Sequence, residues 1–208
     1  LLEKAGILVW PILFCSLAGL TIFFERLLTF RSVGRSDEAI GKVFALLQEG
    51  SVAKAGEYLR ARKKHKRHGF PEERILLEAI AVADTDLETM EMVLMHAVDR
   101  EMKRLARYLS TLATMGSVAP LLGLLGTVMG MIRAFSVVEE MGGRVNASVL
   151  AGGIWEAMLT TAFGLSVAIP LIILHNYLEG KLDAIQASLE EVAVSFLKVW
   201  LSASTKGN

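Results

Sequence analysis

The sequence predicts an all-α integral membrane protein with three transmembrane helices. Of its 208 residues 53% are hydrophobic, yet Lys+Arg and Asp+Glu number 22 each. Both facts fit only if apolar and charged residues are segregated, and three apolar runs each reach the ~20 residues that span a bilayer. This composition excludes a disordered chain and a disulfide scaffold. The formal net charge of zero gives no basic excess for a nucleic-acid partner.

The first predicted transmembrane helix covers residues 5–24, which contain no charged side chain. Twenty residues in a helix extend ~30 Å, the thickness of the hydrocarbon core. A signal peptide is the alternative, but its apolar region would be only ~7–15 residues long. We therefore expect an uncleaved span. The chain starts at Leu1 rather than at Met, which leaves open whether further residues precede it.

A helical region of cytoplasmic location is predicted for residues 25–108. Apolar residues recur at helical spacing in 37–47 and 52–62, and again from Asp86 onward. Because no Gly or Pro interrupts this last pattern, we expect one long helix that enters the membrane. The basic run 60–68 is expected to be a solvated loop, with contact to anionic lipid as the alternative.

The second and third predicted spans cover residues 109–135 and 154–177, joined by a periplasmic loop at 136–153. Apolar residues continue at helical spacing through 178–208. We therefore expect both helices to extend beyond the membrane into the cytoplasm.

The orientation follows from Lys and Arg near the ends of the spans, which are enriched on the cytoplasmic side. Nine lie on the side of the large polar region and the tail, against two on the other side. The nine are Arg26, Arg31, Arg35, Lys42, Arg100, Lys103, Arg104, Arg107 and Lys181. The N-terminus is therefore predicted to be periplasmic and the C-terminus cytoplasmic.

Small residues form a stripe on one face of each of these two spans. In lipid, helices associate where small residues allow their backbones to approach, so these stripes predict packing or pore-facing surfaces. Two prolines belong to the same candidate set, and the proline inside the third span removes a backbone hydrogen bond, which predicts a kink. The candidate residues are Gly123, Gly126, Gly130, Ala157, Gly164, Pro120 and Pro170.

Three polar residues on these faces predict an ion pathway: Thr127, Thr161 and Glu156. A carboxylate inside a membrane is costly unless it is paired or faces water. The alternatives are an interfacial location for Glu156 and, for each threonine, a bond to its own backbone. Glu156 is the only deep carboxylate, so a complete relay needs a second protein. The pattern predicts no enzyme active site, no cofactor and no metal site.

Two sequence segments resemble the signatures of the ExbB/TolQ/MotA proton-channel family. The first is APLLGLLGTVMGM at 119–131, and the second is EAMLTTAFGL at 156–165, followed by Ala168-Ile169-Pro170 and Asn176. Glu25-Arg26-Leu27-Leu28, at the end of the first span, fits as well. The resemblance covers nearly the whole chain and is greatest to ExbB. Three spans match the ExbB and TolQ branch, whereas MotA has four.

The resemblance implies a homopentamer in the bacterial inner membrane, around two copies of an ExbD-like protein. That partner has a single span carrying an Asp, and the assembly uses the proton-motive force to drive a TonB-like protein. Thr127 and Thr161 would face the partner's Asp, with Glu156 on the periplasmic side of the channel. A TolQ-type subunit of the Tol-Pal system and a passive scaffold without ion conduction remain alternatives. The residues leave the coupled ion, H⁺ or Na⁺, open.

Overall fold

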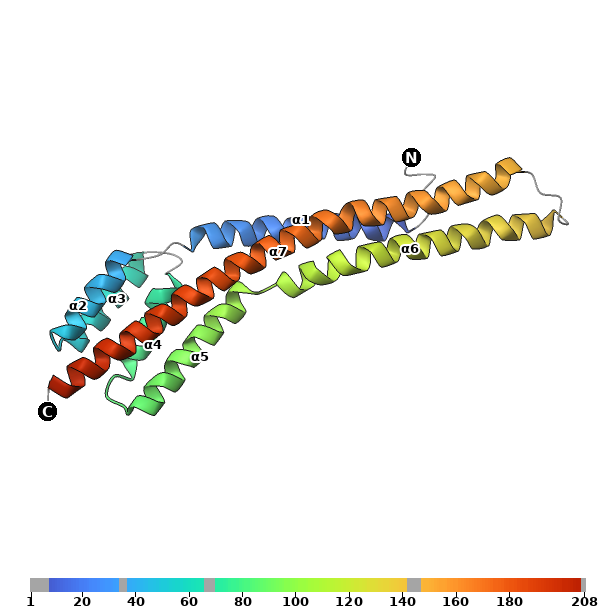
Figure 1. The fold of residues 1–208 in the computed structure, drawn as a ribbon. Helices are drawn as coiled ribbons and strands as arrows, with labels where there is room; N and C mark the ends of the chain where they lie inside the picture. Colours follow the sequence, from blue (N-terminus) through green and yellow to red (C-terminus); the bar gives the residue numbers. More distant parts are fainter. Residues whose placement is uncertain (1–7, 34–36, 66–69, 142–146, 207–208) are drawn as a thin grey trace. The chain divides into compact units, whose positions relative to one another are not determined.

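The computed structural model describes residues 8–33, 37–65, 70–141 and 147–206. These residues form seven helices and no strand, so the predicted all-α class is confirmed for the described part of the chain (Figure 1). The helices are α1 (Val9–Ser32), α2 (Asp37–Gln48), α3 (Val52–His65), α4 (Pro71–Ala81), α5 (Leu87–Leu105), α6 (Leu109–Glu140) and α7 (Ala147–Lys206).

The chain divides into two compact units. Unit 1 comprises residues 1–27 and 108–179, and unit 2 comprises residues 28–107 and 180–208. Each unit contains segments that are distant in sequence, because α1 and α7 contribute to both.

Three helices are apolar and long enough to cross a membrane: Val9–Arg31, Leu109–Glu140 and Leu150–Ala203. Their number agrees with the prediction. α6 continues to Glu140 and α7 begins at Ala147, so both ends of the predicted loop at 136–153 are helical, and residues 142–146 lie outside the described residues. Helix ends do not mark the membrane surface, so the span limits stay predictions.

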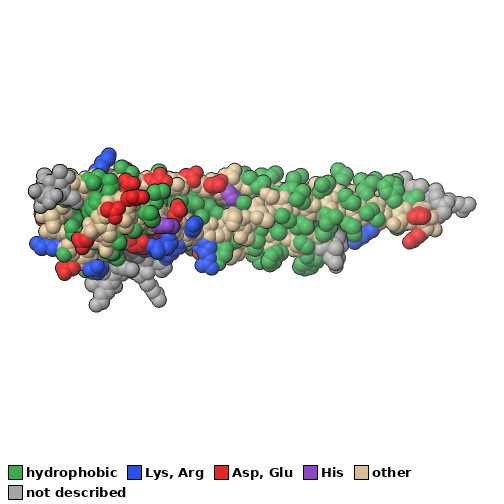
Figure 2. Space-filling view, turned by 90° about the horizontal axis from the view of Figure 1, so that it is seen from below, with side chains coloured by type: hydrophobic (Ala, Val, Ile, Leu, Met, Phe, Trp, Pro, Cys, Tyr) green, Lys and Arg blue, Asp and Glu red, His purple; other side chains and the backbone are tan. Residues whose placement is uncertain are grey.

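The surface of unit 1 is unusually apolar for a protein in water. Trp10, Phe14 and Leu17 on α1 are 73%, 68% and 71% exposed. Apolar side chains cover most of the visible face of this unit, whereas the charged side chains gather mainly over unit 2 (Figure 2). Outward-facing large apolar side chains suit a lipid environment or contact with other membrane helices.

The expectation of one continuous helix from Asp86 into the second span is wrong. α5 ends at Leu105 and α6 begins at Leu109. Tyr108 between them has a φ of 67°, a left-handed conformation that residues with a bulky side chain rarely adopt. The helix therefore breaks without any Gly or Pro, at the point where unit 2 passes into unit 1.

A contact from α1 accounts for part of the stability of this break. The Arg26 guanidinium lies 5.6 Å from the centroid of the Tyr108 ring, within the range of a cation–π interaction. Arg26 itself is buried and donates from Nε and Nη2 to the Glu25 carboxylate, at 2.5 and 2.6 Å. A residue far away in the sequence thus holds the strained position.

Unit 2 has a conventional hydrophobic core, built from α2 to α5 and the last part of α7. Its largest fully buried side chains include Leu47, Leu59, Leu76, Leu94 and Phe196, one from each of these five helices. Near the end of α7 the indole nitrogen of Trp200 donates to the Ala83 carbonyl at 3.1 Å. The helical continuation predicted for 178–208 is therefore observed through Lys206.

The basic run 60–68 differs from its predicted loop. α3 extends through His65, so the first six residues of the run are helical. The rest of the run lies outside the described residues. The helix continues because Val52–His65 contains no proline, and the buried Leu59 anchors it in the core.

α5 begins where the sequence predicts, with Asp86 as its N-cap. The Asp86 carboxylate accepts a bond from the Thr89 hydroxyl at 2.7 Å and one from the Thr89 backbone N–H at 3.2 Å. These bonds, the hydroxyl first, lower the pKa of Asp86 because they favour its charged form. The cap is therefore kept as the pH falls to the ordinary range for Asp, and is lost only below it.

Unit 2 also contains a buried ion pair. Arg74 on α4 donates to both oxygens of Glu101 on α5, at 2.8 and 2.5 Å, and Glu101 is only 7% exposed. Arg100 and Glu78 form a second pair between the same helices, but on the surface. The two pairs differ mainly in burial, which makes them a matched comparison.

We predict that Glu101→Ala destabilises unit 2 far more than Glu78→Ala. Removing one member of a buried pair leaves an uncompensated charge and costs about 3 kcal/mol. Removing an exposed pair costs less than about 1 kcal/mol. Urea unfolding of the detergent-solubilised chain measures both, with the fluorescence of buried Trp200 as the probe and the exposed Trp10 and Trp155 replaced by Phe. Equal losses in the two variants would contradict the assignment.

Candidate functional site

The candidate site lies in unit 1, where α6 and α7 pack against each other with very little space between their backbones. A Cβ atom on Gly164 would lie 2.7 Å from the carbonyl oxygen of Ala119 and 3.0 Å from the Cα of Gly123. Real Cβ atoms do not come so close to backbone atoms. Only glycine therefore fits at this position of α7.

The same contact continues along both helices. A Cβ on Gly126 would lie 2.3 Å from Cγ2 of Thr160, and one on Gly130 would lie 2.7 Å from Cβ of Ala157. Ala157 and Thr160 are 2% and 3% exposed. The two helices are antiparallel, because positions later in α6 contact positions earlier in α7. The five small candidates of the sequence thus share one contact.

The two candidate prolines differ in burial. Pro120 lies inside α6 and is half-buried, whereas Pro170 lies inside α7 and is exposed.

Thr161 reaches across the contact. Its hydroxyl donates to the Gly123 carbonyl on α6 at 2.9 Å. The hydroxyl proton is thereby committed, but the oxygen keeps lone pairs that can accept a bond from another donor. Thr161 can therefore interact with a protonated acid or a cation, and less readily with a carboxylate.

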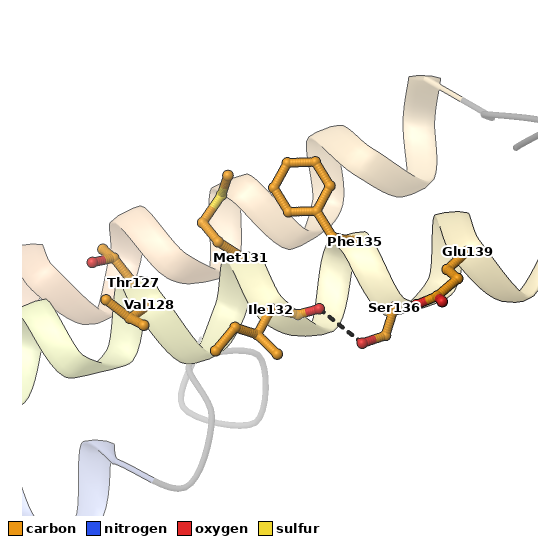
Figure 3. Close-up of a pocket in the computed structure, with 7 residues that line it drawn as sticks. All are labelled: Thr127, Val128, Met131, Ile132, Phe135, Ser136 and Glu139. Atoms are coloured by element: carbon orange, nitrogen blue, oxygen red, sulfur yellow. Dashed lines mark hydrogen bonds between the residues drawn. The ribbon is translucent and has the colours of Figure 1, made fainter.

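The Thr127 hydroxyl does not cross the contact but bonds within α6. It donates to the Leu124 carbonyl at 2.6 Å, the local bond expected as the alternative at the sequence level. Thr127 lines a shallow open groove on α6 with mostly apolar neighbours, as Figure 3 shows. The groove residues are Thr127, Val128, Met131, Ile132, Phe135, Ser136 and Glu139. Within this chain the two threonine hydroxyls are therefore bound to separate carbonyls.

Glu156 is not isolated. Its carboxylate Oε1 lies 3.6 Å from Nη1 of Arg133 on α6, and both side chains are partly exposed. Arg133 is not among the site residues predicted from the sequence. The signal was present, because Arg133 is the single Lys or Arg within 109–135.

No group of three or more His, Cys, Asp and Glu side chains arranged to hold a metal occurs in the described parts of the chain. The site therefore consists of helix-packing glycines, hydroxyls and one ion pair.

The sequence also matches known proteins. Residues 67–191 match the MotA/TolQ/ExbB proton channel family. The chain belongs to this family. The match includes α6, the first part of α7 and all three polar candidates, and with three apolar helices it makes the chain a membrane protein.

Several relatives carry names from two branches of the family. An ExbB-like biopolymer transport protein of Synechocystis sp. is 33% identical over 95% of this chain and 78% of its own length. The biopolymer transport protein exbB1 of Vibrio cholerae is 30% identical over 98% and 88%. The Tol-Pal system protein TolQ of Haemophilus influenzae is 38% identical, but over 43% and 39%.

We predict that Gly164→Ala disrupts the α6–α7 contact, whereas Gly152→Ala does not. The new methyl group at 164 would meet backbone atoms that cannot move aside, while nothing lies within 4 Å of a Cβ at 152. Overpacking costs about 1–3 kcal/mol, and Gly→Ala in an open helix position gains about 0.5–1 kcal/mol. Thermal unfolding in detergent should therefore show a lower Tm for Gly164→Ala and no loss for Gly152→Ala.

Gly126→Ala provides a control for the mechanism. Its clash is with Cγ2 and Cβ of Thr160 rather than with backbone, so Thr160→Gly, which removes both atoms, should recover part of the Tm that Gly126→Ala loses. The same second change should not rescue Gly164→Ala. Rescue of both variants would contradict the proposed backbone contact.

Proposed function

We propose that this chain is the channel-forming subunit of an inner-membrane motor of the ExbB–ExbD type, driven by the proton-motive force. In this proposal it energises TonB-dependent transport across the outer membrane. The observation that carries it is the family match together with two threonine oxygens in α6 and α7 that retain lone pairs. Two ExbB-named relatives align with nearly the whole chain, whereas the ExbB of Salmonella typhimurium and the TolQ of Haemophilus influenzae each align with less than half.

The mechanism needs an ionisable group from another protein. Glu156 is the only Asp or Glu within residues 5–24, 109–135 and 154–177. An ExbD-like partner with one span would supply an Asp, and two copies of it would lie inside a pentamer of this chain. When that Asp is protonated it becomes a hydrogen-bond donor, and the oxygens of Thr127 and Thr161 can accept from it.

Protonation also removes the cost of a bare carboxylate in the membrane. The protonated partner can therefore pass the threonines, and it regains its charge where water is available. Alternating protonation at successive subunits would convert proton flow into movement of the partner. In the orientation predicted from Lys and Arg, which is part of this proposal, unit 2 lies in the cytoplasm and the N-terminus in the periplasm.

A TolQ-type role in the Tol-Pal system is the second candidate, because the TolQ of Haemophilus influenzae shares 38% identity across 90 residues. The two candidates differ in the partner protein, not in the expected chemistry of α6 and α7. Restoration of TonB-dependent uptake or of Tol-Pal function in deletion strains distinguishes them.

We predict that Thr127→Val and Thr161→Val each lower proton flux through the complex about tenfold or more. Each replaces a hydroxyl by a methyl group of similar size, and the loss of about 1.4 kcal/mol at the crossing step corresponds to tenfold. The measurement is dye-reported proton uptake into liposomes containing this protein and its single-span partner, under an imposed potential.

Thr114→Val is the matched control, because the Thr114 hydroxyl also bonds a carbonyl of its own helix, that of Ser110 at 2.9 Å. Proton flux through the Thr114→Val complex should equal that of the wild type. Thr161→Ser keeps the hydroxyl and should retain most of the wild-type flux. Undiminished flux in both valine variants would refute the pathway. A wild-type complex without flux above that of lipid alone would favour a passive scaffold.

A further inference from the structure

The predicted spans contain two residues of the Asp, Glu, Lys and Arg set, one of each sign. Arg133 is the only one within 109–135, Glu156 is the only one within 154–177, and 5–24 contains none. The structure places Nη1 of Arg133 and Oε1 of Glu156 3.6 Å apart. The charged groups of the spans are thus paired with each other.

The small residues of the α6–α7 contact bring the two side chains together. A Cβ on Gly130 would lie 2.7 Å from the Cβ of Ala157, and one on Gly153 would lie 2.6 Å from the Cβ of Ala134. Arg133 precedes Ala134, and Glu156 precedes Ala157. Because the backbones are close at both positions, the two long side chains meet at the edge of the contact.

The pair has a reason to persist in a membrane. In water an exposed ion pair contributes at most about 1 kcal/mol. In apolar surroundings the attraction grows as the dielectric constant falls, and an unpaired carboxylate becomes costly. The side chains of Arg133 and Glu156 are 56% and 37% exposed in the single chain, so an ion or a partner's group can still reach them.

Pairing with Arg133 changes the net charge that Glu156 presents to an ion. A carboxylate next to a guanidinium forms a site of zero net charge, which does not concentrate cations. A free carboxylate at the entrance to a pathway attracts cations and raises their local concentration.

We propose that Arg133 is a positioning residue that controls the availability of Glu156, so that the paired state closes this end of the ion pathway and release of Arg133 opens it. This inference rests on the proposed function, in which Glu156 belongs to that pathway. It assigns a regulatory role to a residue of α6 outside the two threonines and the glycine contact.

The test compares five proteins, each reconstituted with the single-span partner in liposomes: wild type, Arg133→Gln, Arg133→Lys, Glu156→Gln and the double variant Arg133→Gln/Glu156→Gln. Arg133→Gln should raise proton conductance about tenfold, because it leaves Glu156 unpaired. Arg133→Lys keeps the charge and should remain close to the wild type. The double variant should conduct no more than Glu156→Gln, since the gain requires the carboxylate.

A second measurement reports Glu156 directly. Labelling of carboxyl groups by a hydrophobic carbodiimide, read by mass spectrometry, should be faster at Glu156 in Arg133→Gln than in the wild type and Arg133→Lys. A merely structural role of Arg133 would change the Tm but would give no increase in conductance that depends on Glu156.

The outcomes separate this inference from the proposed function. A conducting wild type with unchanged or lower conductance in Arg133→Gln overturns the role of Arg133 alone. A gain that persists in the double variant overturns it as well. A wild-type complex that conducts no protons overturns the proposed function, and the inference with it.

Discussion

The close approach of the α6 and α7 backbones brings together the polar side chains that bridge these two helices. Helices in lipid gain little from burying apolar surface against each other, because the lipid is equally apolar. Their association depends on contact between backbones, which a single methyl group at Gly164 would prevent. The glycines therefore fix the spacing and the register of the two helices together.

The consequences for the polar groups differ with their position around the contact. Thr161 lies at the contact and reaches the Gly123 carbonyl. Arg133 and Glu156 lie beside it and reach each other. Thr127 lines an open groove of α6. The α6–α7 contact thus accounts for one interhelical hydrogen bond and one interhelical ion pair, and Thr127 stays on the exposed groove.

Much of this arrangement can be predicted from the sequence, because the length of apolar runs and the spacing of small residues are local properties. Two further predictions from local sequence are confirmed: α5 starts at its Asp86 cap, and one helix continues through 178–206. The break at Tyr108 could not be predicted. It has no Gly or Pro, and it is supported by Arg26, a residue that becomes a neighbour only in the fold.

The pairing of Arg133 with Glu156 was also missed, since it depends on the register of α6 against α7. Each residue is the only charged one in its predicted span, but nothing in either segment states which positions face each other. The Gly130–Ala157 and Ala134–Gly153 contacts supply that register. The small-residue stripes predicted that the helices pack, but not how far one is shifted along the other.

Cysteine cross-linking in native membranes tests the register most directly. The single native cysteine, Cys15, is first replaced by Ala. Ala134→Cys with Gly153→Cys should then form a disulfide within one chain upon mild oxidation, because a shift of about 1 Å brings their Cβ atoms to disulfide spacing. Ala134→Cys with Ala168→Cys should not, since residue 168 is about 22 Å further along α7. Cross-linking in the second pair, or only between chains in the first, would contradict the account.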